Sequence, residues 1–111
     1  SGGAGISWVN AVTPQSISYD TGYIVTATTP TITVFTLPSS TVGKTFEIAG
    51  YSSGLWQLNQ GTNQQIRFGN TATTVTTGIL SATSQGDSVR ILCTANNNFM
   101  VLNSIGNIFF N

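Results

Sequence analysis

The stretch Thr45-Phe46-Glu47-Ile48-Ala49 alternates apolar and polar side chains, and alternation of this kind decides the fold class. Successive side chains of a β-strand point to opposite faces, so Phe46 and Ile48 share one face while Glu47 takes the other. Similar strand-like runs occur at residues 32–37, 56–58, 66–68 and 89–93. These segments favour strands that are buried on one face.

Clusters of turn-forming residues separate these runs at short intervals. They occupy residues 20–22, 42–44, 52–54, 60–61, 69–70, 85–87 and 96–98. Apolar residues nowhere recur at the spacing of an amphipathic helix. Short strands joined by short turns predict an all-β fold, either an antiparallel β-sandwich or a small barrel. We expect one such domain over residues 6–111, preceded at residues 1–5 by a linker or a cloning remnant.

Charge is scarce in this chain. Only 5% of the residues are charged, histidine is absent, and three acidic side chains balance three basic ones, whereas a soluble domain usually has about a quarter of its residues charged. Lys44, Arg67 and Arg90 are scattered, so they form no basic stripe for a nucleic acid. No apolar run approaches the roughly 20 residues of a membrane span, so we expect no membrane insertion. A neutral surface suits neutral ligands, close packing of copies, or both.

Groups that could carry catalysis are few. Asp20, Glu47 and Asp87 show no spacing that marks a catalytic pair, and a turn or an outward strand position explains each of them. The single cysteine, Cys93, has no histidine as a base and fits a small buried position. The same scarcity leaves no ligand set for zinc or calcium. We therefore expect no enzyme, no cofactor and no metal.

Two segments, residues 51–65 and 96–99, combine aromatic and amide side chains and favour binding of a neutral carbohydrate. Sugars offer apolar faces to aromatic rings and hydroxyls to amide and guanidinium groups. Tyr51, at a turn, suits a platform; Trp56 also fits the core, in phase with Leu58, and Trp8 fits the core or an interface. The candidate ligand-binding residues are Tyr51, Trp56, Asn59, Gln60, Arg67, Asn96, Asn97 and Asn98, and the three asparagines also predict a tight turn.

The chain ends on an apolar run. Phe109 and Phe110 are adjacent, so they face opposite sides of a strand, and residues 99–102 are apolar on both faces. One side would pack on the domain's own core and the other on a second copy; the alternative is a strand buried on both faces within one sandwich. The first interpretation predicts a contact between copies made by Phe99, Val101, Ile108, Phe109 and Phe110.

Several motifs follow one another in a distinctive order along residues 17–108. They are TGY at 21–23, FTLP at 35–38, VGKTFEI at 42–48, GLWQL at 54–58, NQQIRFG at 63–69, DSVRILC at 87–93 and SIGN at 104–107. This order resembles the small β-rich domains that end phage tail fibres and bacterial trimeric fibre adhesins, including the mosaic adhesive fibres of predatory bacteria. Lys44 stands where that family often has Asp, and Phe99 where Trp is common; both bear on ligand preference.

The resemblance implies a homotrimeric knob at the tip of a fibre on the surface of a cell or virion, in contact with glycans or other surface polymers. The leading hypothesis is therefore a receptor-binding tip that recognises a neutral glycan or a related cell-envelope polymer. A purely structural trimerisation cap is one alternative. A monomeric carbohydrate-binding module is another, and it predicts a single copy in solution.

Overall fold

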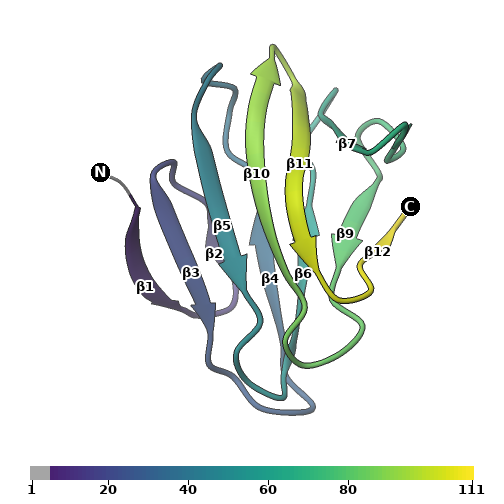
Figure 1. Ribbon diagram of the computed structural model, residues 1–111. Coiled ribbons are helices and arrows are strands. Elements are labelled where there is room, and N and C mark those ends of the chain that lie inside the picture. Colours follow the sequence, from purple (N-terminus) through teal and green to yellow (C-terminus); the bar gives the residue numbers. More distant parts are fainter. Residues whose placement is uncertain (1–5) are drawn as a thin grey trace.

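Residues 6–111 of the computed structural model form two β-sheets that enclose one core (Figure 1). The all-β prediction is confirmed, because every regular element in this range is a strand. Residues 1–5, the predicted linker or cloning remnant, lie outside the described residues. The strands are β1 (Ser7–Ala11), β2 (Gln15–Ser16), β3 (Thr21–Val25), β4 (Ile32–Thr36), β5 (Thr45–Ala49), β6 (Leu55–Asn59), β7 (Gln65–Phe68), β8 (Thr71–Ala72), β9 (Ile79–Ser81), β10 (Ser88–Ala95), β11 (Asn98–Ile105) and β12 (Phe109–Phe110).

Both sheets are mixed, which corrects the expectation of an antiparallel fold. Sheet A has the order β1-β3-β5-β10-β11-β7-β8, and sheet B has the order β12-β9-β6-β4-β2. Parallel pairing joins β1 to β3, β3 to β5 and β7 to β11 in sheet A, and β2 to β4 and β4 to β6 in sheet B. The other neighbouring strands are antiparallel.

Four of the five parallel pairs arise because the first six strands alternate between the sheets. β1, β3 and β5 lie in sheet A, and β2, β4 and β6 lie in sheet B, so each connection crosses from one sheet to the other. Strands that return to the same sheet therefore run in the same direction. Short turns in a sequence suggest hairpins, but a hairpin pairs consecutive strands. In this fold most of the turns join the two sheets instead, which the turn residues themselves do not reveal.

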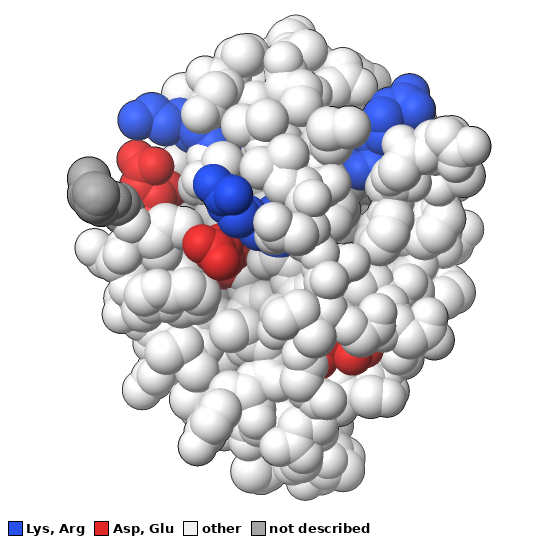
Figure 2. Space-filling view, viewed as in Figure 1, with Lys and Arg blue, Asp and Glu red and all other residues white. Residues whose placement is uncertain are grey.

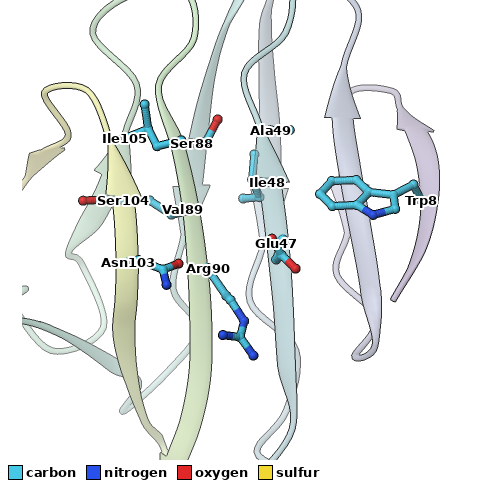
Figure 3. A pocket seen from close by; sticks show the side chains of 10 residues that line it. All are labelled: Trp8, Glu47, Ile48, Ala49, Ser88, Val89, Arg90, Asn103, Ser104 and Ile105. Atoms are coloured by element: carbon cyan, nitrogen blue, oxygen red, sulfur yellow. The ribbon is translucent and has the colours of Figure 1, made fainter. Parts of the chain in front are cut away.

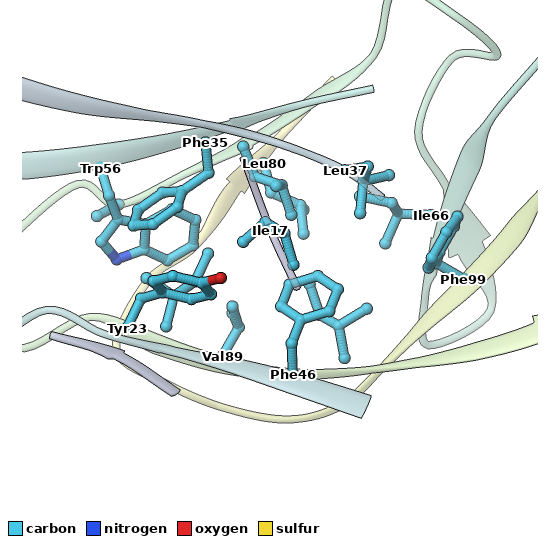
Figure 4. Packing of buried hydrophobic residues seen from close by; sticks show 14 of the residues in the cluster. Ile17, Tyr23, Phe35, Leu37, Phe46, Trp56, Ile66, Leu80, Val89 and Phe99 are labelled. Carbon is cyan, nitrogen blue, oxygen red and sulfur yellow. The ribbon is translucent and has the colours of Figure 1, made fainter. Parts of the chain in front are cut away.

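The core between the sheets combines aliphatic side chains with several large aromatic ones (Figure 4). Tyr23 from sheet A lies against Phe35 and Trp56 from sheet B, Phe46 from sheet A lies farther along the core near Ile17, and all four side chains are buried. The rings of Tyr23 and Phe35 pack edge to face with centroids 5.5 Å apart, an arrangement that aromatic quadrupoles favour. In β5 and β10 the buried positions are those that the alternation predicts, with Glu47 and Arg90 on the opposite face from Phe46.

Trp56 is 0% exposed, so its assignment as a ligand residue is corrected to the alternative, a core position. Its Nε1 donates a 2.8 Å hydrogen bond to the backbone oxygen of Asp87. Asp87 is itself buried, and its Oδ2 accepts hydrogen bonds from the nitrogen and hydroxyl of Thr83 and the nitrogen of Ser84 at 2.9–3.1 Å. These contacts join the start of β10 to β6 and fix both elements.

The C-terminal strand β12 pairs with β9 at the edge of sheet B. Phe110 stacks on Phe68 of sheet A with ring centroids 5.5 Å apart, so it bridges the two sheets. Phe109 faces outward and is 48% exposed, which confirms that the two rings take opposite sides.

The predicted contact between copies is corrected at two positions. Phe99 and Ile108 are buried in the domain's own core, which removes them from any such contact, and Val101 packs against the same core. Phe109 is the member of the predicted set that keeps the largest free surface. Within residues 6–111, no helical segment has the length and hydropathy that a bilayer crossing requires.

Candidate functional site

The ligand residues expected from the sequence lie at opposite ends of the domain. Tyr51 follows β5 and is 73% exposed, whereas residues 96–97 form the turn between β10 and β11, and Asn98 begins β11. β5 and β10 run antiparallel, with Ala49 opposite Ser88 and Thr45 opposite Leu92. The length of these strands therefore separates Tyr51 from the asparagine turn, and a single small ligand cannot touch both.

Amide side chains at the end of β6 and just after it hydrogen-bond within the protein. The Nε2 of Gln60 donates hydrogen bonds to the backbone oxygens of Gln64 and Thr74 at 2.7 and 3.0 Å, and its Oε1 accepts one from the Thr73 hydroxyl. The Oδ1 of Asn59 accepts a 2.7 Å hydrogen bond from Gln57. Gln60 is thereby corrected from a sugar contact to a loop-stabilising residue.

The asparagine turn is confirmed as a turn. Asn97 has a φ of 61°, a conformation that asparagine tolerates better than most residues. Its nitrogen donates a 2.7 Å hydrogen bond to the Ser40 hydroxyl, and Asn98 Nδ2 donates one of 3.0 Å to the Asn96 backbone oxygen. Arg67 and Asn98 line a depression beside this turn, so the fold does bring these two candidates together.

The outer face of sheet A gathers a different set of side chains, which the sequence did not single out. Register places Trp8 beside Gly22, Gly22 beside Glu47, Glu47 beside Arg90, and Arg90 beside Asn103. We call these five residues the Trp8–Asn103 row. It crosses β1, β3, β5, β10 and β11 (Figure 3). With about 4.8 Å between neighbouring strands, the row is about 19 Å long.

Trp8 lies flat on the sheet at one end of this row. A Cβ built on Gly22 would lie 2.4, 2.5 and 2.6 Å from three atoms of the Trp8 six-membered ring. Because these distances are nearly equal, the ring faces Gly22 rather than presenting its edge. Its side chain is 49% exposed, so the opposite face of the indole is open. Glycine at position 22 is what allows the ring to approach the backbone this closely.

Opposite charges stand side by side in the middle of the row. Glu47 on β5 pairs directly with Arg90 on β10. Among residues 6–111, the ion pair within 4.0 Å is the one between Lys44 and Asp20, at 3.4 Å on the surface. The carboxylate of Glu47 and the guanidinium of Arg90 are thus near each other but not locked together. Both remain free to hydrogen-bond hydroxyl groups of a ligand.

A shallow groove of about 450 Å³ runs over this row. Its walls include Trp8, Glu47, Arg90 and Asn103, and Figure 3 shows these side chains spread across the strands. The adjacent outward row adds small and apolar groups, namely Ala49, Ser88 and Ile105. An open aromatic face, a carboxylate, a guanidinium and an amide thus lie along one trough, which is the mixture that orients a sugar in a binding site.

Charge is distributed unequally between the two sheets. Glu47, Arg67 and Arg90 lie on strands of sheet A, whereas none of the five strands of sheet B contains a charged residue. Figure 2, viewed as in Figure 1 with sheet A in front, shows positive and negative side chains spread over this face. The two outer faces of the domain therefore differ chemically.

The row was hidden in the sequence because its members are far apart along the chain. Only the parallel pairing of β1 with β3 and of β3 with β5 brings Trp8, Gly22 and Glu47 together. The available signal was the outward position of Glu47 and Arg90, which the alternation predicts correctly. The segment at 20–22 was predicted as a turn, but β3 begins at Thr21, so Gly22 belongs to a strand.

Within residues 6–111, no group of three or more His, Cys, Asp or Glu side chains is arranged to hold a metal ion. Cys93 is buried, as the sequence indicated. Comparison of the chain with protein-family models and with curated proteins found no match.

Proposed function

We propose that this domain is a saccharide-binding tip of a homotrimeric surface fibre, and that the groove over the Trp8–Asn103 row holds the sugar. The observation that carries this proposal is the Trp8 ring, which lies flat over Gly22 with its other face open. A pyranose packs its apolar face on such a ring, while its hydroxyls reach Glu47, Arg90 and Asn103. The scarcity of charge suits a ligand that is mostly neutral.

The binding proposal is tested by screening the domain on a glycan array and measuring hits by calorimetry. Trp8→Ala should weaken binding about tenfold or more, and Trp8→Phe should restore part of it, because a sugar face covering about 50 Å² of ring gains roughly 1.3 kcal/mol. Tyr51→Ala is the matched control, since Tyr51 is an exposed aromatic residue outside the groove. A loss of about tenfold in Tyr51→Ala, with no loss in Trp8→Ala, would place the site at Tyr51 instead of the groove.

Assembly as a homotrimer is the second part of the proposal, and the uncharged face of sheet B supports it. Its outward positions include Ile32, Val34, Gln57 and Phe109, and register aligns Val34, Gln57, Ser81 and Phe109 across four strands. Copies that meet through such a face suffer no charge repulsion and bury no unpaired charge. Weak single sites on a trimer would then gain avidity of about 10² to 10⁴.

Light scattering tests this part. We expect a mass three times the 11.6 kDa of one chain. Phe109→Asp should reduce the mass to that of a single chain without unfolding the domain. A wild-type monomer that still binds saccharide would favour a carbohydrate-binding module instead. A trimer that binds no saccharide and attaches to no cell would favour a structural cap.

A further inference from the structure

The outer face of sheet A has a second depression beside the groove. It has a volume of about 340 Å³, and its walls include Arg67, Thr94, Asn98 and Met100. Register aligns Thr45, Leu92, Met100 and Arg67 in one outward row across β5, β10, β11 and β7. This row lies on the same face as the Trp8–Asn103 row and crosses β10 and β11 as well. The two rows are offset along β10 by the two residues from Arg90 to Leu92, about 7 Å, so a ligand that crosses the sheet obliquely passes from the groove to Arg67.

Arg67 is the cationic end of this face. Its side chain is exposed and has no carboxylate within ion-pair distance among residues 6–111. The three acids lie elsewhere: Asp20 contacts Lys44, Asp87 is buried before β10, and Glu47 is on β5, three strands away from β7 in the sheet order. The positive charge of Arg67 is thus not compensated locally.

The other polar groups around Arg67 are already engaged within the protein. Gln65 Nε2 donates a 2.9 Å hydrogen bond to the Thr73 backbone oxygen, and Asn98 Nδ2 donates one to Asn96. The Thr94 hydroxyl donates one of 3.3 Å to the Asn98 backbone oxygen. The guanidinium of Arg67, with five N–H donors, is the richest source of donors for a ligand in this depression, and its planar fork matches a carboxylate or a sulfate.

Resting on the proposed function, we infer that the ligand is an acidic oligosaccharide that lies across sheet A. A neutral sugar unit packs on Trp8 at one end, and a unit bearing a carboxylate or sulfate group meets Arg67 at the other. The zero net charge of the chain conceals this polarity, because Glu47 balances one cation of this face and leaves Arg67 unbalanced. From β1 to β7 the ligand crosses five strand spacings, about 24 Å, so it must be several sugar units long.

The test compares matched acidic and neutral oligosaccharides of one backbone, such as an oligouronate and its methyl ester, together with sulfated and unsulfated pairs on the same array. The acidic members should bind about two- to fivefold more tightly, as expected for an exposed charged pair. Salt at 0.5 M, where the Debye length is only about 4 Å, should remove the preference. The sulfated and carboxylated pairs show which anionic group is preferred.

Arg67→Gln should abolish the preference for acidic members and leave binding of neutral members unchanged. Lys44→Gln is the matched control, because it removes the same charge from an exposed position that lines neither depression. An unchanged preference in Arg67→Gln, or an equal loss in Lys44→Gln, would overturn the inference. Neutral binding that depends on Trp8 but shows no acidic preference would overturn it and leave the proposed function intact, whereas absence of any saccharide binding would overturn both.

Discussion

Replacing Gly22 by alanine gives the most specific perturbation of the Trp8 platform. The added methyl group would lie 2.4–2.6 Å from the ring, whereas carbon atoms pack best at about 3.5–4.0 Å. The ring must therefore move outward by about 1 Å or more. The backbone of β3 accepts alanine, because Gly22 lies in a strand and is not at a positive φ. The substitution thus disturbs the ring without straining the chain.

The expected stability change is small. About half of the Trp8 surface, on the order of 100 Å², is buried against the protein. Losing all of this contact would lower the free energy of unfolding by at most about 2.5 kcal/mol. Replacing glycine by alanine also lowers the conformational entropy of the unfolded chain, which raises the free energy of unfolding by about 0.4–1 kcal/mol. We therefore expect Gly22→Ala to lower the free energy of unfolding by no more than about 2 kcal/mol, so the domain stays folded while saccharide affinity falls about tenfold.

The assay is a double-mutant cycle with calorimetry and urea denaturation. If Gly22→Ala acts through the ring, it reduces saccharide affinity in the wild type but not in a Trp8→Ala background. Tryptophan emission checks that the ring has moved, since Trp56 remains buried and constant. Trp8 is not the sugar platform if Gly22→Ala displaces its ring and the affinity stays at the wild-type value, or if the effects of the two substitutions on affinity are fully additive.

Three further predictions concern stability and are measured by urea denaturation. Thr33 is 1% exposed and its hydroxyl has no hydrogen-bond partner, so Thr33→Val should stabilise the domain by about 1 kcal/mol; a destabilised variant would show that the hydroxyl is satisfied. Asp87→Ala removes three hydrogen bonds and should lower the free energy of unfolding by about 3 kcal/mol. Lys44→Ala breaks an exposed ion pair and should lower it by less than about 1 kcal/mol. Similar losses in the two variants would show that the buried hydrogen bonds of Asp87 are no stronger than the surface pair. Burial raises the pKa of Tyr19 from 10.0 to about 12, so the unfolded chain loses this proton first and stability should fall between pH 10 and pH 12; Tyr19→Phe should show a shallower fall.

Local features of the fold could be predicted from the sequence. The faces of Phe46, Ile48 and Glu47, and the outward position of Arg90, follow from alternation alone, because side chains in any strand alternate whatever its neighbours are. The turns at 69–70 and 96–97 follow from residues that tolerate a positive φ. These properties depend on a few adjacent residues.

The pairing of strands could not be predicted in the same way. Crossing between sheets and folding back as a hairpin need similar short turns, so parallel and antiparallel arrangements look alike in the sequence. In β3, Gly22 is covered by Trp8 and is therefore buried on the outer face, which disguises the alternation. The two-residue strands β2, β8 and β12 are too short to show any period.

The candidate site depended on this pairing. The sequence predicts Trp8 in the core or an interface, and only the fold shows that one face of its ring lies on Gly22 while the other is open. Tyr51 is exposed as a platform would be, but it lies away from the groove, and Trp56 belongs to the core. The sequence predicts Arg67 as a ligand residue, and the fold places it beside a depression; the absence of a nearby carboxylate could be seen only in the fold.

The most direct test of the account is a two-dimensional NMR titration of the domain with the oligosaccharide that binds best on the array. The account predicts that the Trp8 indole N–H and the backbone amides of Gly22, Glu47, Arg90 and Asn103 shift together, while the amides around Tyr51 and on the outer face of sheet B do not. Shifts confined to the loop at Tyr51 or to the strands of sheet B, with Trp8 unaffected at saturation, would contradict it.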